Sequence, residues 1–302
     1  MKKQRPHSFA LEQFSLLHYW GKKHLTPTEI VFRILAFLFF AAVSFSYIYL
    51  IFWCFYSGTR DHVEFAKDPF GFSSMHFDHY GEVFEKIESN GTSFFGMILN
   101  SVYFSFLGPL ICIFVSCRLA YTTSKYKFFG SGLIYLIIIV VITLPIYGSQ
   151  SSMYRLLFQL GWLNSRLMLL TSINGFTIWY LYFYGFFKSV SWTYAEAAKI
   201  DGANPWQIYY RIMFPQALPM FGALFLMLWV ADWNSYGTAL IYLPKMPTLA
   251  VGIYQFQTLA RYNNRMDLLY AACALSMLPP LILFVFCNKA LMSNVSIGGI
   301  KE

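Results

Sequence analysis

One acidic residue, Asp232, stands inside a long apolar run, and side chains able to bind a sugar surround it. A charge within a membrane span is costly and usually faces a cavity or a polar partner. Carboxylate, amide and hydroxyl groups hydrogen-bond sugar hydroxyls, and aromatic rings stack on the apolar faces of pyranose rings. Trp229, Trp233 and Tyr236 are spaced i, i+4 and i+7, which places them on one face of a helix. We therefore predict a solute pathway lined by Asp232, Trp233, Asn234 and Tyr236.

The same cluster has a second interpretation, which the residues alone leave open. Trp and Tyr are enriched where membrane spans meet the membrane–water interface. A polar patch used only for helix packing near that interface would carry the same residue types. A transport assay on variants of Asn234 and Tyr236 separates the two interpretations.

Two other constellations that could do chemistry are weak. His76, Asp78 and His79 could ligate a metal, but nothing nearby completes a ligand set, so we expect a solvated loop. The phosphate-binding pattern Gly-x-x-x-x-Gly-Lys-Ser/Thr is missing, because Leu16 stands where the pattern around Gly21-Lys22 needs a glycine. We therefore expect no cofactor in this chain and no ATP hydrolysis by it.

A polar stretch, residues 196–215, separates two apolar runs and has a definite predicted shape. Residues 196–200 are good helix formers, and Asp201-Gly202 ends that helix because glycine readily adopts the left-handed conformation. Asn204-Pro205 starts a second helix, with Asn as its cap and Pro at its first position. We expect Pro215 to end this short helix before the next span. The shape suits the docking of another protein.

The composition of the chain indicates a membrane protein. Of its 302 residues, 57% are hydrophobic and 12% are charged, whereas soluble domains carry about 25% charged residues. Several runs without Asp, Glu, Lys or Arg reach the roughly 20 residues of a spanning helix. They do not alternate as the strands of a membrane barrel do. The predicted fold class is therefore an all-α integral membrane protein with six transmembrane helices.

The expected organisation is a cytoplasmic tail at 1–32, a transmembrane domain at 33–292 and a cytoplasmic tail at 293–302. The six spans cover about 34–57, 93–118, 130–148, 167–187, 217–243 and 267–289. Placing both termini inside puts the larger share of Lys and Arg in the cytoplasm, so an N-in, C-in topology is preferred. This topology explains the net charge of +8, and no nucleic-acid partner is expected.

The 196–215 stretch closely resembles the EAA loop of ABC importer permeases. That loop reads Glu-Ala-Ala, three residues, Gly, nine residues, Ile, any residue, Leu, Pro. The positions in register are Glu196, Ala197, Ala198, Gly202, Ile212 and Pro215, and Phe214 replaces the Leu. The resemblance implies that residues 189–216, with Asp201 in the turn, form a coupling loop that seats in a groove of a cytoplasmic ATPase.

Other motifs resemble the carbohydrate-uptake class of these permeases. They are Gly161-Trp162-Leu163-Asn164, Trp233-Asn234, Pro247-Thr248-Leu249-Ala250-Val251-Gly252 and Gly298-Gly299-Ile300-Lys301, where Glu302 then replaces a usual Gly. Six spans and a modest outside loop are similar to the smaller of the two maltose-type permease subunits. The resemblance implies the type I ABC importer permease fold in a bacterial cytoplasmic membrane.

The resemblance also implies the partners of the chain. A second, homologous permease would complete a heterodimer around the pathway, within membrane lipid. Two ATPase subunits, which hold the ATP and Mg²⁺, would dock on the cytoplasmic side. An extracellular or periplasmic solute-binding protein would deliver a sugar or oligosaccharide from the other side.

Three rival functions follow from the same residues. An ABC permease for an amino acid or a polyamine would share the coupling loop, and the ligand of its binding protein would identify it. A secondary transporter would need several intramembrane ionisable residues, whereas Asp232 stands alone. A membrane-embedded enzyme is weaker still, because no His–Glu–His or Ser–His constellation lies within the spans.

Overall fold

The computed structural model describes residues 26–72, 74–144 and 148–294, and nearly all secondary structure in these ranges is helical. The tails predicted at 1–32 and 293–302 lie largely outside the described residues. The chain divides into two compact units, Met1–Trp53 and Cys54–Glu302.

The described part of the first unit is a single apolar helix, which belongs to α2 (Pro27–Ser57). The Thr26 N–H donates to Glu29 Oε2 at 3.0 Å, and the Glu29 N–H donates to Thr26 Oγ1 at 3.4 Å, so a capping box starts the helix. With 31 residues α2 is roughly 45 Å long, enough to cross a bilayer core of about 30 Å. Its apolar side chains are exposed almost throughout residues 27–53. A helix that is apolar on every side requires lipid or another chain around it.

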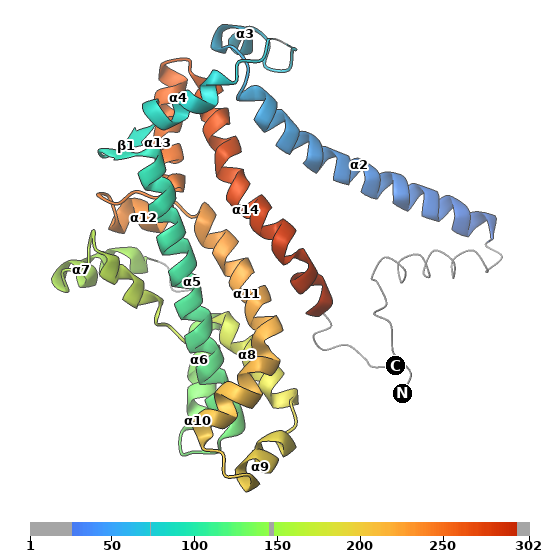
Figure 1. Cartoon of the computed structure of the whole chain (residues 1–302), viewed down its shortest axis with the longest axis vertical. Helices are drawn as coiled ribbons and strands as arrows, with labels where there is room; N and C mark the ends of the chain where they lie inside the picture. Colours follow the sequence, from blue (N-terminus) through green and yellow to red (C-terminus); the bar gives the residue numbers. More distant parts are fainter. Residues whose placement is uncertain (1–25, 73, 145–147, 295–302) are drawn as a thin grey trace. The chain divides into compact units, whose positions relative to one another are not determined.

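Three long helices frame the second unit: α5 (Phe94–Lys125), α11 (Phe214–Asn234) and α14 (Met266–Asn294). α5 packs against α11 and against α8 (Ile178–Ser189), and α11 also packs against α14 (Figure 1). Prolines lie inside all three helices.

The contact between α5 and α8 combines aromatic packing with hydrogen bonds. Tyr121, Tyr180 and Phe183 are buried in one apolar cluster there. The Thr123 and Tyr180 hydroxyl oxygens lie 2.7 Å apart, and those of Ser116 and Thr177 lie 3.0 Å apart. Each hydroxyl thus finds a partner on the facing segment, as polar groups between membrane helices must.

Four helices in the described part of the chain are long and apolar enough to cross a membrane. They are Pro27–Ser57, Phe94–Lys125, Pro205–Asn234 and Met266–Cys287. Each overlaps one of the six predicted spans. The other two predicted spans, 130–148 and 167–187, contain shorter helices. These are α6 (Ser131–Thr143), the 3₁₀ helix η1 (Arg166–Ser172) and α8.

The predicted fifth span, 217–243, is divided by a break. α11 ends at Asn234, and a separate short helix, α12 (Gly237–Tyr242), follows it. The Ser235 N–H bonds the Asp232 carbonyl at 3.2 Å, which closes the last turn of α11. α11 therefore ends two residues after Asp232, the acidic residue that the sequence analysis singles out.

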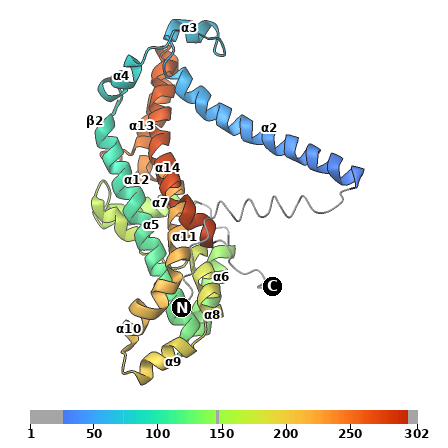
Figure 2. The same ribbon diagram turned by 45° about the vertical axis from the view of Figure 1, so that its right-hand side comes forward.

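Short elements build the end of the second unit that carries α4 (Figure 2). They are α3 (His62–Lys67), α4 (Asp78–Lys86), β1 (Glu88–Ser89), β2 (Thr92–Ser93) and α13 (Leu249–Tyr262), with α7 (Ser149–Gln159) nearer the middle. The two strands pair antiparallel around Asn90-Gly91, whose φ angles are +49° and +75°. Positive φ at both positions is the signature of a type I′ hairpin turn, which Asn-Gly favours.

A charged cluster fixes α4 to the start of α14. Arg265 Nη2 donates to Glu82 Oε2 at 2.9 Å and to Asp267 Oδ2 at 3.0 Å, while Lys86 Nζ donates to Glu82 Oε2 at 2.6 Å. These bonds from Lys86 and Arg265 lower the pKa of Glu82 to about 2. Of the predicted solvated loop, His76 and Asp78 are exposed, whereas His79 is buried with its Nδ1 3.6 Å from Asp267 Oδ2. Among the described residues no group of three His, Cys, Asp or Glu could hold a metal ion.

Candidate functional site

The helix–turn–helix predicted around Gly202 is present. α9 (Thr193–Ile200) leads into a turn where Gly202 has a φ of +81°, and α10 (Pro205–Ile208) follows. Asn204 caps α10: its Oδ1 accepts from the Gln207 N–H at 2.9 Å, and its own N–H donates to Gln207 Oε1 at 2.9 Å. Local capping and turn chemistry therefore set this shape, as the sequence predicts.

The prediction that Pro215 ends the short helix was wrong. One helix runs without a break from Pro205 to Asn234, through the π-helical turn η2 (Tyr209–Met213) and into α11. The Phe214 N–H bonds the Tyr209 carbonyl, five residues back, so the helix register is shifted just before Pro215. Pro215 then occupies the first turn of α11, where a missing N–H is tolerated.

Most of the EAA-type positions lie on the surface of this segment, which we call the loop segment (residues 193–215). Glu196, Ala197, Asp201, Gly202 and Pro215 are exposed, whereas Ala198 is buried and Ile212 is half-buried. Buried Ala195 and Ala198 face the apolar cluster beneath the segment. The alanines therefore allow close packing, and the polar members of the motif face outward.

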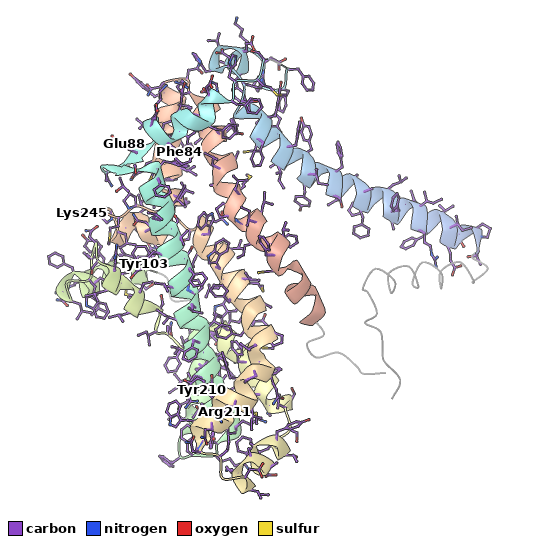
Figure 3. The ribbon with its side chains drawn as sticks, viewed as in Figure 1. Phe84, Glu88, Tyr103, Tyr210, Arg211 and Lys245 are labelled. Atoms are coloured by element: carbon purple, nitrogen blue, oxygen red, sulfur yellow. The ribbon has the colours of Figure 1, made fainter. Side chains whose placement is uncertain are left out.

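Exposed apolar side chains gather on the same surface. They are Tyr194, Ile200, Trp206 and Tyr210, with Ile200 87% and Trp206 58% exposed. The Trp206 and Tyr210 rings stack with centroids 6.0 Å apart and planes inclined by 9°. Figure 3 places Tyr210 and Arg211 at the end of the second unit opposite Phe84 and Glu88. Exposed apolar side chains that gather on one segment are typical of surfaces that contact another protein or a membrane.

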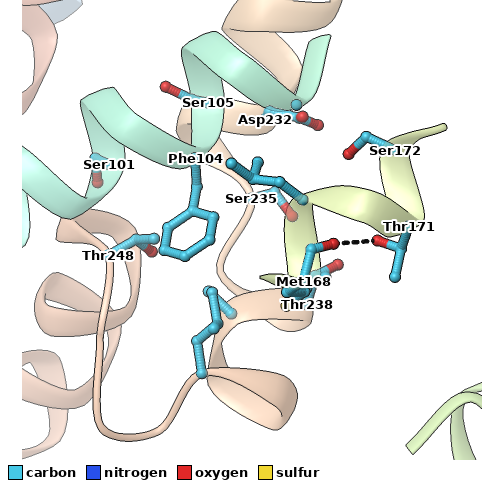
Figure 4. Close-up of a pocket in the computed structure, with 14 residues that line it drawn as sticks. Ser101, Phe104, Ser105, Met168, Thr171, Ser172, Asp232, Ser235, Thr238 and Thr248 are labelled. Atoms are coloured by element: carbon cyan, nitrogen blue, oxygen red, sulfur yellow. Dashed lines mark hydrogen bonds between the residues drawn. The ribbon is translucent and has the colours of Figure 1, made fainter. Parts of the chain in front are cut away.

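A second feature is a cavity of about 150 Å³ beside Asp232 (Figure 4). Hydroxyl side chains from four further segments line it. They are Ser101, Ser105, Thr171, Ser172, Ser235, Thr238 and Thr248. The Asp232 carboxylate is exposed to this space. We call it the Asp232 cavity.

Gly108 has no side chain, and this keeps the space next to Asp232 open. A Cβ at Gly108 would lie 3.4 Å from Ser172 Oγ and 3.6 Å from Asp232 Oδ2. Ser105 Oγ and Thr248 Oγ1 are buried and have no hydrogen-bond partner among the described residues. A buried hydroxyl without a partner is costly, so these two groups are available to a polar ligand or to water.

The remaining predicted pathway residues do not join Asp232. Trp233 is buried, stacks on Trp229 at 5.4 Å, and donates its Nε1–H to the Ser276 carbonyl at 3.1 Å. Trp233, Asn234 and Tyr236 together line a neighbouring pocket of about 230 Å³. Since successive helical residues point about 100° apart, Asp232 and Trp233 face different neighbours.

The single-face pattern read from Trp229, Trp233 and Tyr236 holds only in part. Tyr236 lies beyond the end of α11 and stacks on Tyr254 of α13, with ring centroids 4.4 Å apart. The helical spacing therefore stops applying at the break after Asn234.

Residues of two motifs that resemble the carbohydrate-uptake class each make contacts near the Asp232 cavity. The Asn164 N–H donates to the Tyr242 carbonyl at 3.0 Å, and Asn164 Oδ1 accepts from the Lys245 N–H at 2.8 Å. The Leu249 N–H donates to Ser101 Oγ at 2.7 Å. Gly252 packs on Met97, and a Cβ at Gly252 would fall 2.2 Å from the Met97 sulfur. Of these contacts, the bond from Leu249 reaches a residue of the cavity wall, Ser101.

Known proteins resemble this chain over most of its length. It is 25% identical to the arabinooligosaccharides transport system permease protein AraQ of Bacillus subtilis (strain 168), over 91% of this chain and 98% of that protein. It is 25% identical to the diacetylchitobiose uptake system permease protein NgcG of Streptomyces coelicolor, over 82% of each chain. The fold also matches a chain in the crystal structure of a bacterial ABC transporter involved in the import of the acidic polysaccharide alginate. That match has a TM-score of 0.70 and 21% identity and covers 89% of this chain and 99% of the other.

The family assignment rests on a longer pattern than any single motif. The pattern of the family described as "binding-protein-dependent transport system inner membrane component" matches residues 113–296, which is more than half of the chain. The matched region contains α8, the loop segment, α11 and α13. The chain therefore belongs to this family of membrane-embedded transport subunits.

Proposed function

We propose that this chain is a permease subunit of an ATP-driven importer for a sugar or oligosaccharide. The relatives named above carry sugars in their names, and the matched structure is that of an alginate importer. The proposed cargo class rests on these names together with the hydroxyl-lined Asp232 cavity. A non-sugar cargo, such as an amino acid or polyamine, is the alternative that the binding-protein ligand would reveal.

The loop segment is proposed as the coupling element toward a cytoplasmic ATPase. The EAA-type register, the exposed apolar side chains and the continuous helical connection into α11 support this role. The connection is the observation that carries the proposal, because no loop interrupts the helix between Trp206 and Asp232. A push on Trp206 would be passed along the helix toward Asp232.

The proposed assembly has further chains. A homologous second permease forms the heterodimer, two ATPase subunits hold ATP and Mg²⁺, and an external solute-binding protein delivers the cargo. The chain would cross a bacterial cytoplasmic membrane six times with both termini inside. The four long apolar helices support four of these crossings. α6 and α8, packed on α5, are proposed to complete the other two within the lipid-embedded assembly.

The Asp232 cavity is the proposed place where this chain meets its cargo. A carboxylate accepts strongly from sugar hydroxyls, and the unpaired Ser105 and Thr248 hydroxyls can both donate and accept. Asn234 and Tyr236 are proposed to line the adjoining part of the pathway, and Trp233 to hold α11 against α14. Alternating access then requires that the cargo bind the outward and inward states with different affinity.

A pull-down tests the coupling role directly. The tagged chain, co-expressed with its partner permease and ATPase subunits, should retain the ATPase through mild detergent extraction. Removal of residues 196–215 should lose the ATPase while the partner permease is still recovered. Retention of the ATPase at the full level by the deletion variant would refute the proposed docking role.

A further inference from the structure

One arginine, Arg118 of α5, lies against the aromatic side chains of the loop segment. Its guanidinium carbon is 4.3 Å from the ring centroid of Trp206 and 4.3 Å from that of Tyr209. Both distances are well within the range of a cation–π contact. Trp206 is in the first turn of α10 and Tyr209 is three residues later, so both rings lie on the same face of the helix. Arg118 is therefore held by two rings from one side of the loop segment.

The cation–π contacts with Trp206 and Tyr209 are the main interactions of the Arg118 guanidinium among the described residues. Arg118 Nη1 is buried and has no hydrogen-bond partner among the described residues. A third aromatic ring, that of Tyr121, is 6.0 Å from the guanidinium carbon. No salt bridge to Arg118 occurs in the part of the chain that the structure describes. A cation without a carboxylate partner in such a place depends on aromatic faces for compensation.

The two rings differ in what lies on their other side. Tyr209 is fully buried, packs on Tyr121 at 4.8 Å, and donates its hydroxyl hydrogen to Cys117 Sγ at 3.8 Å. Trp206 is 58% exposed and belongs to the outward-facing aromatic surface. Arg118 thus links that outer surface to the core of the second unit.

α5 contains both Arg118 and residues that line the Asp232 cavity. Arg118 lies ten residues beyond Gly108, and Ser101 and Ser105 precede Gly108 on the same helix. The helix from Pro205 to Asn234 likewise carries Trp206 near one end and Asp232 near the other. The Arg118 contact therefore joins the two helices that both reach the Asp232 cavity, ten residues along α5 from Gly108 in the cavity wall.

We propose that Arg118 is a positioning residue that makes the loop segment and α5 move together. The inference rests on the coupling role proposed for the loop segment and adds the contact that carries motion into α5. Without the guanidinium, the loop segment could shift while α5 stays in place. ATP hydrolysis on the partner subunits would then continue with less sugar moved for each ATP.

The variant Arg118→Met tests whether the positive charge of Arg118 matters or only the volume of its side chain. Methionine keeps an unbranched apolar stem of similar reach, so a packing role alone would survive the change. Arg118→Lys keeps the charge but loses the planar guanidinium, and we expect it to lie between the wild type and Arg118→Met. Arg211→Gln is the matched control, because Arg211 is an exposed arginine of the same segment that forms no cation–π contact and no salt bridge within the described residues.

Two readouts on the purified complex test the proposal. Hydrogen–deuterium exchange of residues 203–213 should be about tenfold faster in Arg118→Met than in the wild type, since loss of the contact loosens the segment. In proteoliposomes the sugar moved per ATP hydrolysed should fall by about fivefold or more, while the ATPase subunits remain bound. Arg211→Gln should change neither value.

Each outcome decides a separate claim. The proposal would be overturned if Arg118→Met had the same exchange rate and the same amount of sugar moved per ATP as the wild type. Faster exchange with an unchanged amount of sugar per ATP would also overturn it. If the wild-type complex moved no sugar, the proposed function itself would fail. The exchange measurement would still decide whether Arg118 holds the loop segment.

Discussion

Trp206 and Asp232 lie on one uninterrupted helix that runs from Pro205 to Asn234. The first is exposed on the aromatic surface of the loop segment, and the second faces a cavity lined by hydroxyl groups. A helix of 30 residues is roughly 45 Å long, which exceeds the thickness of a bilayer core of about 30 Å. A displacement at Trp206 can therefore reach Asp232 without crossing a loop.

Removal of the Asp232 charge should weaken binding of the cargo. We expect Asp232→Asn to raise the half-saturating sugar concentration for uptake by about tenfold, which is the effect of losing roughly 1.4 kcal/mol from a charge-assisted hydrogen bond. Gly108→Ala should act in the same direction, because its Cβ would come within 3.4 Å of Ser172 Oγ and narrow the cavity. Uptake assays over a range of sugar concentrations measure both effects.

Asn234→Ala compares the adjoining pocket, which Asn234 lines, with the Asp232 cavity. Asn234 Nδ2 donates to the Val230 carbonyl at 2.8 Å on the same helix. We expect Asn234→Ala to change the half-saturating concentration less than Asp232→Asn does. Equal and normal uptake by all three variants would leave the Asp232 cavity without a role in transport.

Trp233 should matter for stability more than for cargo. Trp233→Ala removes a buried ring and its hydrogen bond to the Ser276 carbonyl, and such truncations cost about 3–5 kcal/mol. We expect a lower unfolding temperature of the purified complex. Trp233→Phe, which keeps a ring against Trp229, should lose less. An unfolding temperature unchanged by Trp233→Ala would contradict the packing role.

The charged cluster around Glu82 should make stability depend on pH in the acidic range. Hydrogen bonds from Lys86 and Arg265 lower the pKa of Glu82 from its ordinary value of 4.5 to about 2. A lowered carboxyl pKa stabilises the folded state above pH 4.5, and this stabilisation is lost as the pH falls from about 4.5 toward about 2.

Unfolding temperatures of the complex measured over that pH interval check this expectation. Glu82→Gln should weaken the pH dependence, because the amide does not titrate. Glu85→Gln is the control, since Glu85 is exposed on the same helix and forms no ion pair within the described residues. If the difference in unfolding temperature between the wild type and Glu82→Gln did not become smaller as the pH fell, ionised Glu82 would not contribute to stability as proposed.

The turn at Gly202 offers a test of the docking surface. Gly202 has a φ of +81°, so any other residue at this position would be conformationally strained. A Cβ added there would have no atom within 4 Å, so it would not clash. Gly202→Asp also adds a negative charge beside exposed Asp201. We expect Gly202→Asp to abolish the stimulation of ATPase activity by the loaded binding protein. Gly202→Asn, which tolerates the left-handed conformation and adds no charge, should retain more of it.

Local chemistry made the loop segment predictable from sequence. The Asn204 cap, the proline at the start of α10 and the positive φ of Gly202 all depend on residues within a few positions of one another. The continuation through Pro215 was not predictable, because the rule that proline ends a helix does not include a π-helical turn placed just before it. The Asn90-Gly91 hairpin had a local signal as well, the Asn-Gly pair itself.

The cavity could be predicted only in part. Asp232 stands out because an acidic residue is rare in an apolar run, and it does line the cavity. Ser105, Ser172 and Thr248 come from distant parts of the chain, and a serine or threonine in a membrane helix carries no distinctive signal. Which of the residues after Asp232 would share its surroundings depended on where α11 ends, a boundary that the sequence pattern does not set.

ATP-driven uptake by proteoliposomes tests the central claim most directly. The vesicles would contain this chain, its partner permease and ATPase subunits, with ATP inside and the binding protein and a radiolabelled sugar outside. Arabinotriose, diacetylchitobiose and raffinose are suitable probes. We predict that at least one accumulates only when ATP is present, and that Gly202→Asp abolishes this accumulation. Uptake that proceeds equally without ATP, or that Gly202→Asp leaves at the wild-type rate, would contradict the account.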